Sequence, residues 1–455
     1  MFYQGVKKTS VFIILVCIIW ANKIFSASNG DIGELIIRPE TKAIKQFAQK
    51  EKRKFILNFS GDLALESFYD SRQILGKYQD EFVITPLPFF KDERCLDIND
   101  KDQFNMLGIR AYTRLHVLGP EVWGALTSAK LEAKFTGVNN ESVRLLRLNK
   151  AYVQFDWERT KLLLGHDYHP IGRYTFMTGD KFYPFTLSSA WGAGFDPFRY
   201  VAQARLAHKY KNSEILLALT KFYNSENARR VTRPDIFLQV STVIKDRNVF
   251  AIGLSNNVEV PRLETLQGFK TTQQISSIVA FISSLIRVDP FKIESRFIYA
   301  ENGELFDLIG GFAVSCYNPD NDERTYVPLR AVNFWTDITY EGLLRAEPGL
   351  YIGVTKNIGA SRSIIKSAVM SDEEKVNLIE GDLSKINNMF VISPRIRMRW
   401  GPMMVGAEIE FLRVAFARRS DFEDGWEEDF ANNGEVIHTR PVSNTRFLVS
   451  TRYYF

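Results

Sequence analysis

Residues 444–455 alternate between apolar and polar side chains. One parity holds Phe447, Val449, Thr451, Tyr453 and Phe455, and the other holds Arg446, Leu448, Ser450, Arg452 and Tyr454. Successive side chains of a strand point to opposite faces, so this pattern predicts a strand with one apolar and one charged face. A membrane β-barrel with a wet lumen contains such strands, and so does a secreted β-sandwich.

Strand-like segments of this kind recur along the whole chain. They cover residues 55–69, 104–118, 121–136, 144–157, 160–167, 199–211, 214–224, 234–245, 248–258, 270–288, 291–301, 328–340, 343–356, 389–400, 402–417 and 444–455. That makes sixteen, and bacterial single-chain barrels contain an even number of strands.

The connections between these segments alternate in length. Turn formers make the short ones at Gly119-Pro120, Glu158-Arg159, 211–213, Asp246-Arg247, Asp289-Pro290, Glu341-Gly342 and Gly401-Pro402. The long ones cover 70–103, 137–143, 168–198, 225–233, 259–269, 302–327, 357–388 and 418–443. Barrels have short turns at one end and long loops at the other, whereas a sandwich has no reason to alternate so strictly. The sequence therefore predicts an all-β fold, a transmembrane antiparallel β-barrel of about 16 strands.

Charged residues on the predicted strands indicate which face is wet. Arg395, Arg397 and Arg399 share one face of a strand whose other face is apolar. An arginine on the lipid face at mid-depth costs ~2–4 kcal/mol, so this face should line the lumen. Pro394 lies among them and predicts a bulge or a local break, because proline has no N–H for the ladder. Apart from its serines and Arg287, the stretch Ile275–Val288 is apolar on both faces, which leaves a partner subunit, a folded-in loop or a different register as explanations.

The two ends of the chain suggest export. Lys7 and Lys8 precede a short apolar run, and small residues follow at 26–28, so residues 1–28 are expected to be a signal peptide. Residues 29–54 are expected to form a short periplasmic extension and residues 55–455 the barrel. No later segment has the length of apolar sequence that a transmembrane helix needs. A chain that ends on an aromatic-rich strand with a terminal Phe455 resembles bacterial outer-membrane barrels in this respect.

Composition narrows the class of partner. The formal charge of +5 falls to +2 without the signal, which contributes three lysines and no acid. This near-neutral balance argues against a nucleic-acid partner. Aromatic residues make up 13% of the chain, as barrels with aromatic girdles at both membrane interfaces require. Export permits a disulfide between Cys95 and Cys316, both in predicted loops, but two cysteines do not establish one.

Residues 145–172 carry a family resemblance. The strand ending in AYVQFDW, the tight turn after it and the segment LLLGHDYHP resemble the DcaP-like trimeric porins, and QARLAHKY at 203–210 continues the likeness. The resemblance implies 16-stranded homotrimers in the outer membrane of a Gram-negative bacterium that take up small, often negatively charged solutes. Some members carry an N-terminal coiled coil, but residues 39–54 show no sustained heptads.

The resemblance also implies that the third long loop, 168–198, folds into the lumen and forms a constriction. Its charged residues are Arg173, Asp180, Lys181 and Asp196. The alternative is a surface loop that its own aromatic residues hold together.

Basic residues exceed acidic ones on the faces expected to point inward. The basic set is Arg110, Arg114, Lys130, Lys134, Lys150, Arg205, Lys209, Lys292, Arg296, Arg395, Arg397, Arg399, Arg446 and Arg452; the acidic set is Asp62, Glu66, Glu132, Asp156, Glu294, Asp337, Glu408 and Glu410. Fourteen against eight predicts a positive lumen and a mild anion preference. The arginines at 110, 114, 205, 296, 395, 397, 399 and 446 are the candidate pore-lining residues. If these charges pair with one another across the wall instead, the pore would be nearly unselective.

Motifs for catalysis are missing from the sequence. It has no GxSxG, HExxH or CxxC pair, and no phosphate-binding glycine loop. His166 and His169 lack further ligands for a metal site, so we expect them to pack or hydrogen-bond where the third loop begins. The sequence favours a passive porin for small hydrophilic solutes, in contact with outer-membrane lipid and without enzyme activity or cofactor. A channel specific for anionic, carboxylated nutrients and a structural or adhesive barrel remain as alternatives.

Overall fold

A computed structural model of the chain describes residues 55–77, 82–135, 145–172, 194–222, 225–245, 247–369, 375–418 and 426–455. The chain divides into two compact units, Met1–Ile37 and Arg38–Phe455, and all described residues belong to the second. The expected signal peptide, 1–28, and the expected extension, 29–54, lie outside the described residues.

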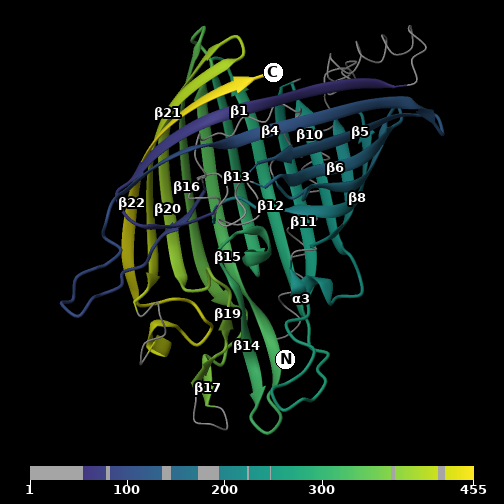
Figure 1. The fold of residues 1–455 in the computed structure, drawn as a ribbon. Helices are drawn as coiled ribbons and strands as arrows, with labels where there is room; N and C mark the ends of the chain where they lie inside the picture. The colour runs from purple at the N-terminus through teal and green to yellow at the C-terminus, as the bar shows by residue number, and fades with distance from the viewer. Residues whose placement is uncertain are drawn as a thin grey trace. The chain divides into compact units, whose positions relative to one another are not determined.

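Sixteen antiparallel strands close into a barrel (Figure 1). In ring order they are β1 (Ile56–Asp70), β4 (Gln103–Val122), β5 (Ala125–Lys134), β6 (Arg147–Asp156), β7 (Thr160–Tyr168), β8 (Tyr200–Tyr210), β9 (Ser213–Lys221), β10 (Asp235–Ile244), β11 (Asn248–Glu259), β12 (Ile275–Val288), β13 (Phe291–Glu301), β15 (Glu323–Tyr340), β16 (Ala346–Ala360), β20 (Ile386–Trp400), β21 (Met403–Ala417) and β22 (Thr439–Tyr454). Pairing of β22 with β1 completes the ring. The predicted fold class and all sixteen predicted strands are confirmed.

The first strand, β1, and the C-terminal end of the last strand, β22, lie in close contact where the ring closes. The Gly61 N–H donates to the Phe455 carbonyl at 2.8 Å, and the Phe455 N–H donates to the Gly61 carbonyl at 3.0 Å. A Cβ at residue 61 would lie 2.5 Å from the Phe455 ring. Glycine at this position therefore leaves the space in which the terminal aromatic ring packs against β1.

Further short elements extend the sheet or lie in the connections. They are β2 (Ile74–Lys77), β3 (Phe82–Pro86), β14 (Gly311–Asn318), β17 (Ser367–Val369), β18 (Lys375–Asn377), β19 (Ile379–Glu380), α3 (Glu226–Arg229), η2 (Gly303–Phe306) and η3 (Trp426–Asp429). The labels α3, β14, β17 and β19 gather at the end of the barrel opposite the C-terminus in Figure 1.

The prediction of a loop over 302–327 is wrong. Strand β14 pairs with the first residues of β15 and with β19, so these strands continue the sheet beyond the ring. The first residues of β14, Gly311–Val314, are buried without alternation, which hides a strand from a pattern of period two.

The turn predicted at Gly119-Pro120 is also wrong. Strand β4 continues to Val122, with an irregularity in its pairing to β5 between Leu118 and Glu121. The turn follows at Trp123 and Gly124, whose φ angles of 52° and 72° are both positive. Two positive φ values match the backbone twist of a tight hairpin better than the Gly-Pro pair does.

At Pro394, for which a bulge or a local break is predicted, β20 contains a local break in its pairing with β21 and no bulge. Its pairing with β16 runs through Leu350 opposite Pro394 in constant register. Its pairing with β21 stops at Ile392 and resumes at Arg395, again in the same register. The proline thus interrupts the ladder on one side only, because it has no N–H to donate. The register of the strand is the same before and after it.

The outward face is apolar and carries aromatic residues near the short turns. Phe447 and Val449 of β22 are 50% and 52% exposed, while Leu448 between them is buried. Trp123 is 80% exposed and stacks on Phe155, which stacks on Trp157. Exposed apolar bands edged by aromatic rings are the surface that a lipid bilayer covers.

The described helices are short. None of those within the described ranges has both the length and the apolar character needed to cross a membrane. Cys95 and Cys316 are both exposed and unbonded, and Cys316 lies in β14 instead of a loop.

Candidate functional site

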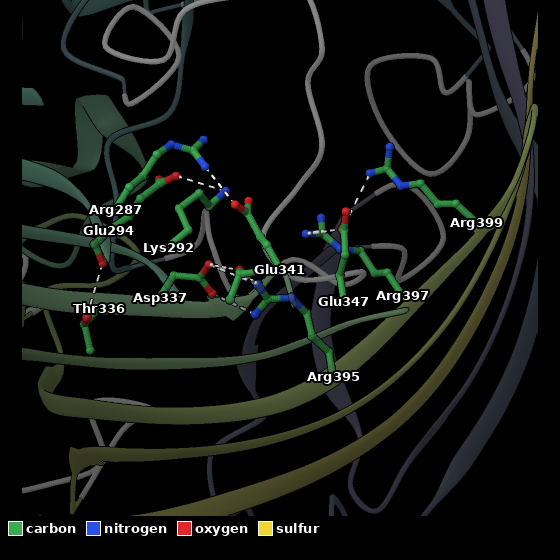
Figure 2. Close-up of polar contacts among 11 residues, drawn as sticks. Arg287, Lys292, Glu294, Thr336, Asp337, Glu341, Glu347, Arg395, Arg397 and Arg399 are labelled. Carbon is green, nitrogen blue, oxygen red and sulfur yellow. Dashed lines mark hydrogen bonds and ion pairs between the residues drawn. The ribbon is translucent and has the colours of Figure 1, made fainter. Parts of the chain in front are cut away.

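A charged wall lines the lumen near the short-turn ends of β15, β16 and β20. Arg395 on β20 reaches across β16 to Asp337 on β15, where Nη1 lies 2.7 Å from Oδ1 (Figure 2). Its Nη2 donates to Asp337 Oδ2 at 3.0 Å and to Thr339 Oγ1 at 3.1 Å. Gly349 on β16 makes this crossing possible, because a Cβ there would lie 2.6 Å from Arg395 Cζ.

The Arg395–Asp337 pair is fully buried, since both side chains are 0% exposed. Two charges removed from water stabilise a fold only when each satisfies the other with good geometry. Here only the Nη2–Oδ2 contact is a hydrogen bond, and the Nη1–Oδ1 contact is an ion pair without hydrogen-bond geometry, but the pair as a whole is electrically neutral. The Arg395 side chain is thus part of the wall of the lumen and is not exposed to solvent.

The next two arginines along β20 share one carboxylate. Arg397 Nη2 lies 3.1 Å from Glu347 Oε2, and Arg399 Nη2 lies 3.8 Å from the same oxygen. Figure 2 shows both guanidinium groups directed toward Glu347 in the barrel interior. Arg399 and Glu347 are 29% and 31% exposed, so these groups are accessible to water. Together the three groups carry a formal charge of +1.

Other basic side chains of the lumen, four arginines and Lys150, also lie in ion pairs. The pairs are Arg446–Asp70 at 2.7 Å, Arg452–Glu66 at 3.3 Å, Arg114–Asp62 at 2.9 Å, Arg114–Glu132 at 3.0 Å, Arg205–Asp167 at 3.3 Å and Lys150–Asp167 at 3.3 Å. All these side chains project from the inward faces of neighbouring strands. Cross-wall pairing, the alternative left open by the sequence, therefore describes most of the described candidate arginines.

The described ends of the third loop lie inside the barrel. Residues 169–172 and 194–199 are here called the third-loop limbs. Asp196 accepts from Arg296 Nη1 on β13 and from Trp335 Nε1 on β15, both at 3.0 Å. Arg296 Nη2 also donates to the Ile171 carbonyl, so one guanidinium contacts both limbs. The inward fold expected for this loop is confirmed for its limbs.

His169 is a buried residue at the start of the first limb, directly after β7. Its Nδ1 accepts from the Ile171 N–H at 3.0 Å, which assigns the proton to Nε2 and makes Thr220 Oγ1, 3.2 Å away, the acceptor. Rings of Phe222, Phe237 and Phe306 surround the imidazole at 5.1–5.7 Å. Burial lowers the pKa of His169 to about 3, so the ring stays neutral. This is the packing role that the sequence suggested for this residue.

Apolar side chains join the limbs to the wall. Phe195 packs beside Gly353 on β16, where a Cβ would lie 2.8 Å from Phe195 Cδ1. The same core contains Val279 and Phe281 from the inward face of β12. The two-sided apolar pattern of β12 is therefore explained by a folded-in loop, with lipid on one face and the limbs on the other.

Four candidate residues fall outside what the structure describes. Arg173, Asp180 and Lys181 lie outside the described residues, and Arg110 is placed on β4 opposite Ala64 without a described side chain. The sequence analysis missed Glu347, Asp70 and Asp167 as partners. Continuing the alternation would have revealed Glu347, because it lies directly opposite Arg397 in the pairing of β16 with β20.

The barrel has the form of known outer-membrane channels. The chain is similar to the outer membrane channel DcaP of Acinetobacter baumannii, with a TM-score of 0.60 and 13% identity over 88% of this chain and 97% of that one. It is also similar to the anion-selective porin from Comamonas acidovorans, with a TM-score of 0.52 and 9% identity over 88% of this chain and 100% of that one. No family model and no curated protein matches the sequence. At these identities the likeness establishes the fold alone, and the chain has the fold of a DcaP-like porin.

Proposed function

We propose that the chain is a passive diffusion channel of the outer membrane for small hydrophilic solutes, with a mild preference for anions. The observation that carries this proposal is the closed barrel of sixteen strands with ionic side chains on its inward face. A barrel of this size leaves an aqueous channel when loops only narrow it. The chain acts without covalent chemistry, and among the described residues no group of His, Cys, Asp and Glu is arranged to hold a metal ion.

The mild anion preference is supported by the wall around Glu347. Arg395 is neutralised by Asp337, whereas Arg397 and Arg399 share one acid. A permeating ion responds to the net charge of the groups that water reaches. The accessible pair of Arg399 and Glu347 is neutral in formal charge, and the surplus positive charge belongs to Arg397, whose side chain is only 6% exposed and lies 3.1 Å from Glu347. The three groups together carry +1, so their field favours anions modestly.

A channel specific for carboxylated solutes is the second candidate. Glu347 is shared by the guanidinium groups of Arg397 and Arg399, and it is partly exposed. A carboxylate of a solute has the same shape and charge as Glu347 and would bind the same two arginines. This exchange would give the channel a saturable site.

Liposome swelling separates these two candidates. Proteoliposomes are placed in isotonic solutions of neutral sugars, monocarboxylates and dicarboxylates of graded size. A diffusion channel admits all three classes with rates that fall with size. Rates that saturate for carboxylates alone would favour the specific channel, and no swelling with any solute would contradict both.

We also propose a homotrimeric assembly. The apolar outward face of the barrel supplies surface for contacts with lipid and with neighbouring subunits. Equilibrium ultracentrifugation in density-matched detergent tests the assembly. A protein mass of three chains is expected, and a mass of one chain would contradict it.

A further inference from the structure

A second segment lies against the third-loop limbs inside the barrel. Residues 302–310, which join β13 to β14, are here called the inner segment. Phe306, Leu308 and Ile309 of this segment are all 0% exposed and belong to the same apolar core as Ile171 and Phe195. The inner segment therefore occupies the interior together with the third-loop limbs and is not a surface loop.

The inner segment has a tightly defined backbone. Asn302 and Asp307 flank η2 in the left-handed conformation, with φ of 49° and 58°. A Cβ at Gly303 would lie 2.5 Å from the Ile309 carbonyl oxygen. Residues that tolerate positive φ or close approach occupy these positions, so the sequence of the segment suits one compact shape.

Backbone hydrogen bonds join the inner segment to the returning limb of the third loop. The Gly194 N–H donates to the Asp307 carbonyl at 2.8 Å, and the Phe198 N–H donates to the Phe306 carbonyl at 3.0 Å. Gly194 and Leu308 also form a parallel bridge. The two segments thus lie side by side, joined by one isolated parallel bridge and two backbone hydrogen bonds.

The side chain of Arg199 also connects the returning limb to the inner segment. Its Nε donates to the Leu305 carbonyl at 2.9 Å, and its Nη2 donates to the Glu304 carbonyl at 3.3 Å. The same Nη2 lies 2.9 Å from Asp307 Oδ1. The Arg199 carbonyl in turn accepts from the His169 N–H at 2.8 Å, which connects the first limb of the third loop. One residue therefore contacts the inner segment and both limbs.

We propose that the inner segment is a second constriction element and that Arg199 is a positioning residue that helps to set how far the third-loop limbs narrow the pore. This inference rests on the proposed channel function. Arg199 need not touch a solute, because it acts by holding the limbs against the inner segment. Without it, the limbs keep their contacts to Arg296 and Trp335 but lose the side-chain contacts that hold them against the inner segment, so the open cross-section increases.

Single-channel recording of Arg199→Ala in planar bilayers tests the proposal. Since the conductance of a water-filled pore scales with its cross-section, we expect a rise of roughly 1.5- to 2-fold and swelling rates that increase most for the largest solutes. Arg199→Lys keeps the charge opposite Asp307 but loses the forked contacts to the carbonyls, so it should give a smaller rise. Heat-modifiable gel mobility confirms that each variant is folded.

Arg230→Ala is the matched control. Arg230 also joins a carboxylate to a loop carbonyl, donating to Glu226 Oε1 at 2.5 Å and to the Pro261 carbonyl at 2.6 Å, but in the connections next to α3. It should conduct as the wild type does. A folded Arg199→Ala channel with wild-type conductance and size limit would overturn the inference while leaving the channel function intact.

Asp307→Asn keeps the test decisive if Arg199→Ala does not fold. Asparagine tolerates the left-handed backbone at this position and removes only the ion pair. We expect a rise in conductance in the same direction but smaller, and an unchanged value would overturn the inference. A wild-type protein that folds but does not conduct would instead contradict the proposed channel itself, and this inference with it.

Discussion

The inward face of strand β16 contacts two different environments along its length. Near its start, Glu347 and Gly349 face the charged wall, and further along Gly353 faces the third-loop limbs. Both glycines leave space for a side chain from elsewhere. Gly349 gives room to the guanidinium of Arg395, which comes from the adjacent strand, and Gly353 gives room to the ring of Phe195, which comes from a distant loop.

The difference shows how the two regions are specified. Partners in the charged wall come from adjacent strands or, for Arg395 and Asp337, from strands on either side of β16, so strand register determines them. Partners in the inner layer come from segments that the register does not bring together, so packing of apolar surface and a few buried polar contacts determines them. Substitutions in the wall should therefore change charge and stability, whereas those in the inner layer should change the shape of the pore.

The largest expected effect is that of Asp337→Ala. It leaves the guanidinium of Arg395 buried without its carboxylate, and breaking a buried pair on one side costs ~3–5 kcal/mol. Unfolding in urea, followed by heat-modifiable gel mobility, should show the loss. Asp289→Ala removes an exposed partner of Arg247 and should cost at most about 1 kcal/mol.

Asp337→Leu combined with Arg395→Met sharpens this comparison. Removing both charges together leaves no buried ion, so the double variant should be more stable than Asp337→Ala alone. Equal midpoints for Asp337→Ala and Asp289→Ala would contradict the role given to the buried pair.

Gly353→Val should have a smaller effect, and on the inner layer. Its side chain would enter the space of Phe195 Cδ1 and of Val391 Cγ1, which lies 3.0 Å from the position of a Cβ. Overpacking of this kind costs ~1–3 kcal/mol, and displacement of the limb should alter the conductance. Gly108→Val is the control, because only Leu65 Cδ1 lies near its Cβ position, at 3.8 Å. A folded Gly353→Val channel with wild-type conductance would mean that Phe195 does not shape the pore.

Much of the wall could be predicted from the sequence, because alternation encodes it. The strands, the inward direction of Arg395, Arg397 and Arg399, and the even strand number all follow from period two. The inner layer could not be predicted in the same way. Asp196 and Arg296 are 100 residues apart, and no pattern along the chain marks them as partners. The inner segment was assigned to a surface loop for the same reason.

Glu347→Gln should change selectivity with little effect on stability. Removing the shared carboxylate raises the formal charge of its group with Arg397 and Arg399 from +1 to +2. The ratio of chloride to potassium permeability should rise by about twofold, because the accessible field becomes more positive. Reversal potentials in a salt gradient measure the ratio. A fall in that ratio would show that Glu347 does not oppose the two arginines.

The smallest effect is expected from Glu304, whose carboxylate faces the connection before β20. Asp382 N–H donates to Glu304 Oε1 at 3.4 Å, and burial raises the pKa of this carboxyl to about 7 from an ordinary 4.5. A raised pKa means that the folded state binds the proton more tightly than the unfolded state. Its stabilisation is full below about pH 4.5 and is lost as the pH rises through about 7.

Glu304→Gln imitates the protonated form and should remove this pH dependence. Melting temperatures of the wild type and the variant should converge at pH 4.5 and separate at pH 8, with the wild type lower. The same difference in melting temperature between wild type and variant at pH 4.5 and at pH 8 would contradict the raised pKa of Glu304.

The central claim is that this barrel is an open channel whose charged wall gives it a mild anion preference. Single-channel current of the purified protein in a planar bilayer, recorded in a potassium chloride gradient, tests that claim most directly. The account predicts large open steps with a reversal potential on the chloride side, which moves toward zero when Arg397→Ala and Arg399→Ala are combined. Folded barrels that give no steps, or steps that favour potassium, would contradict it.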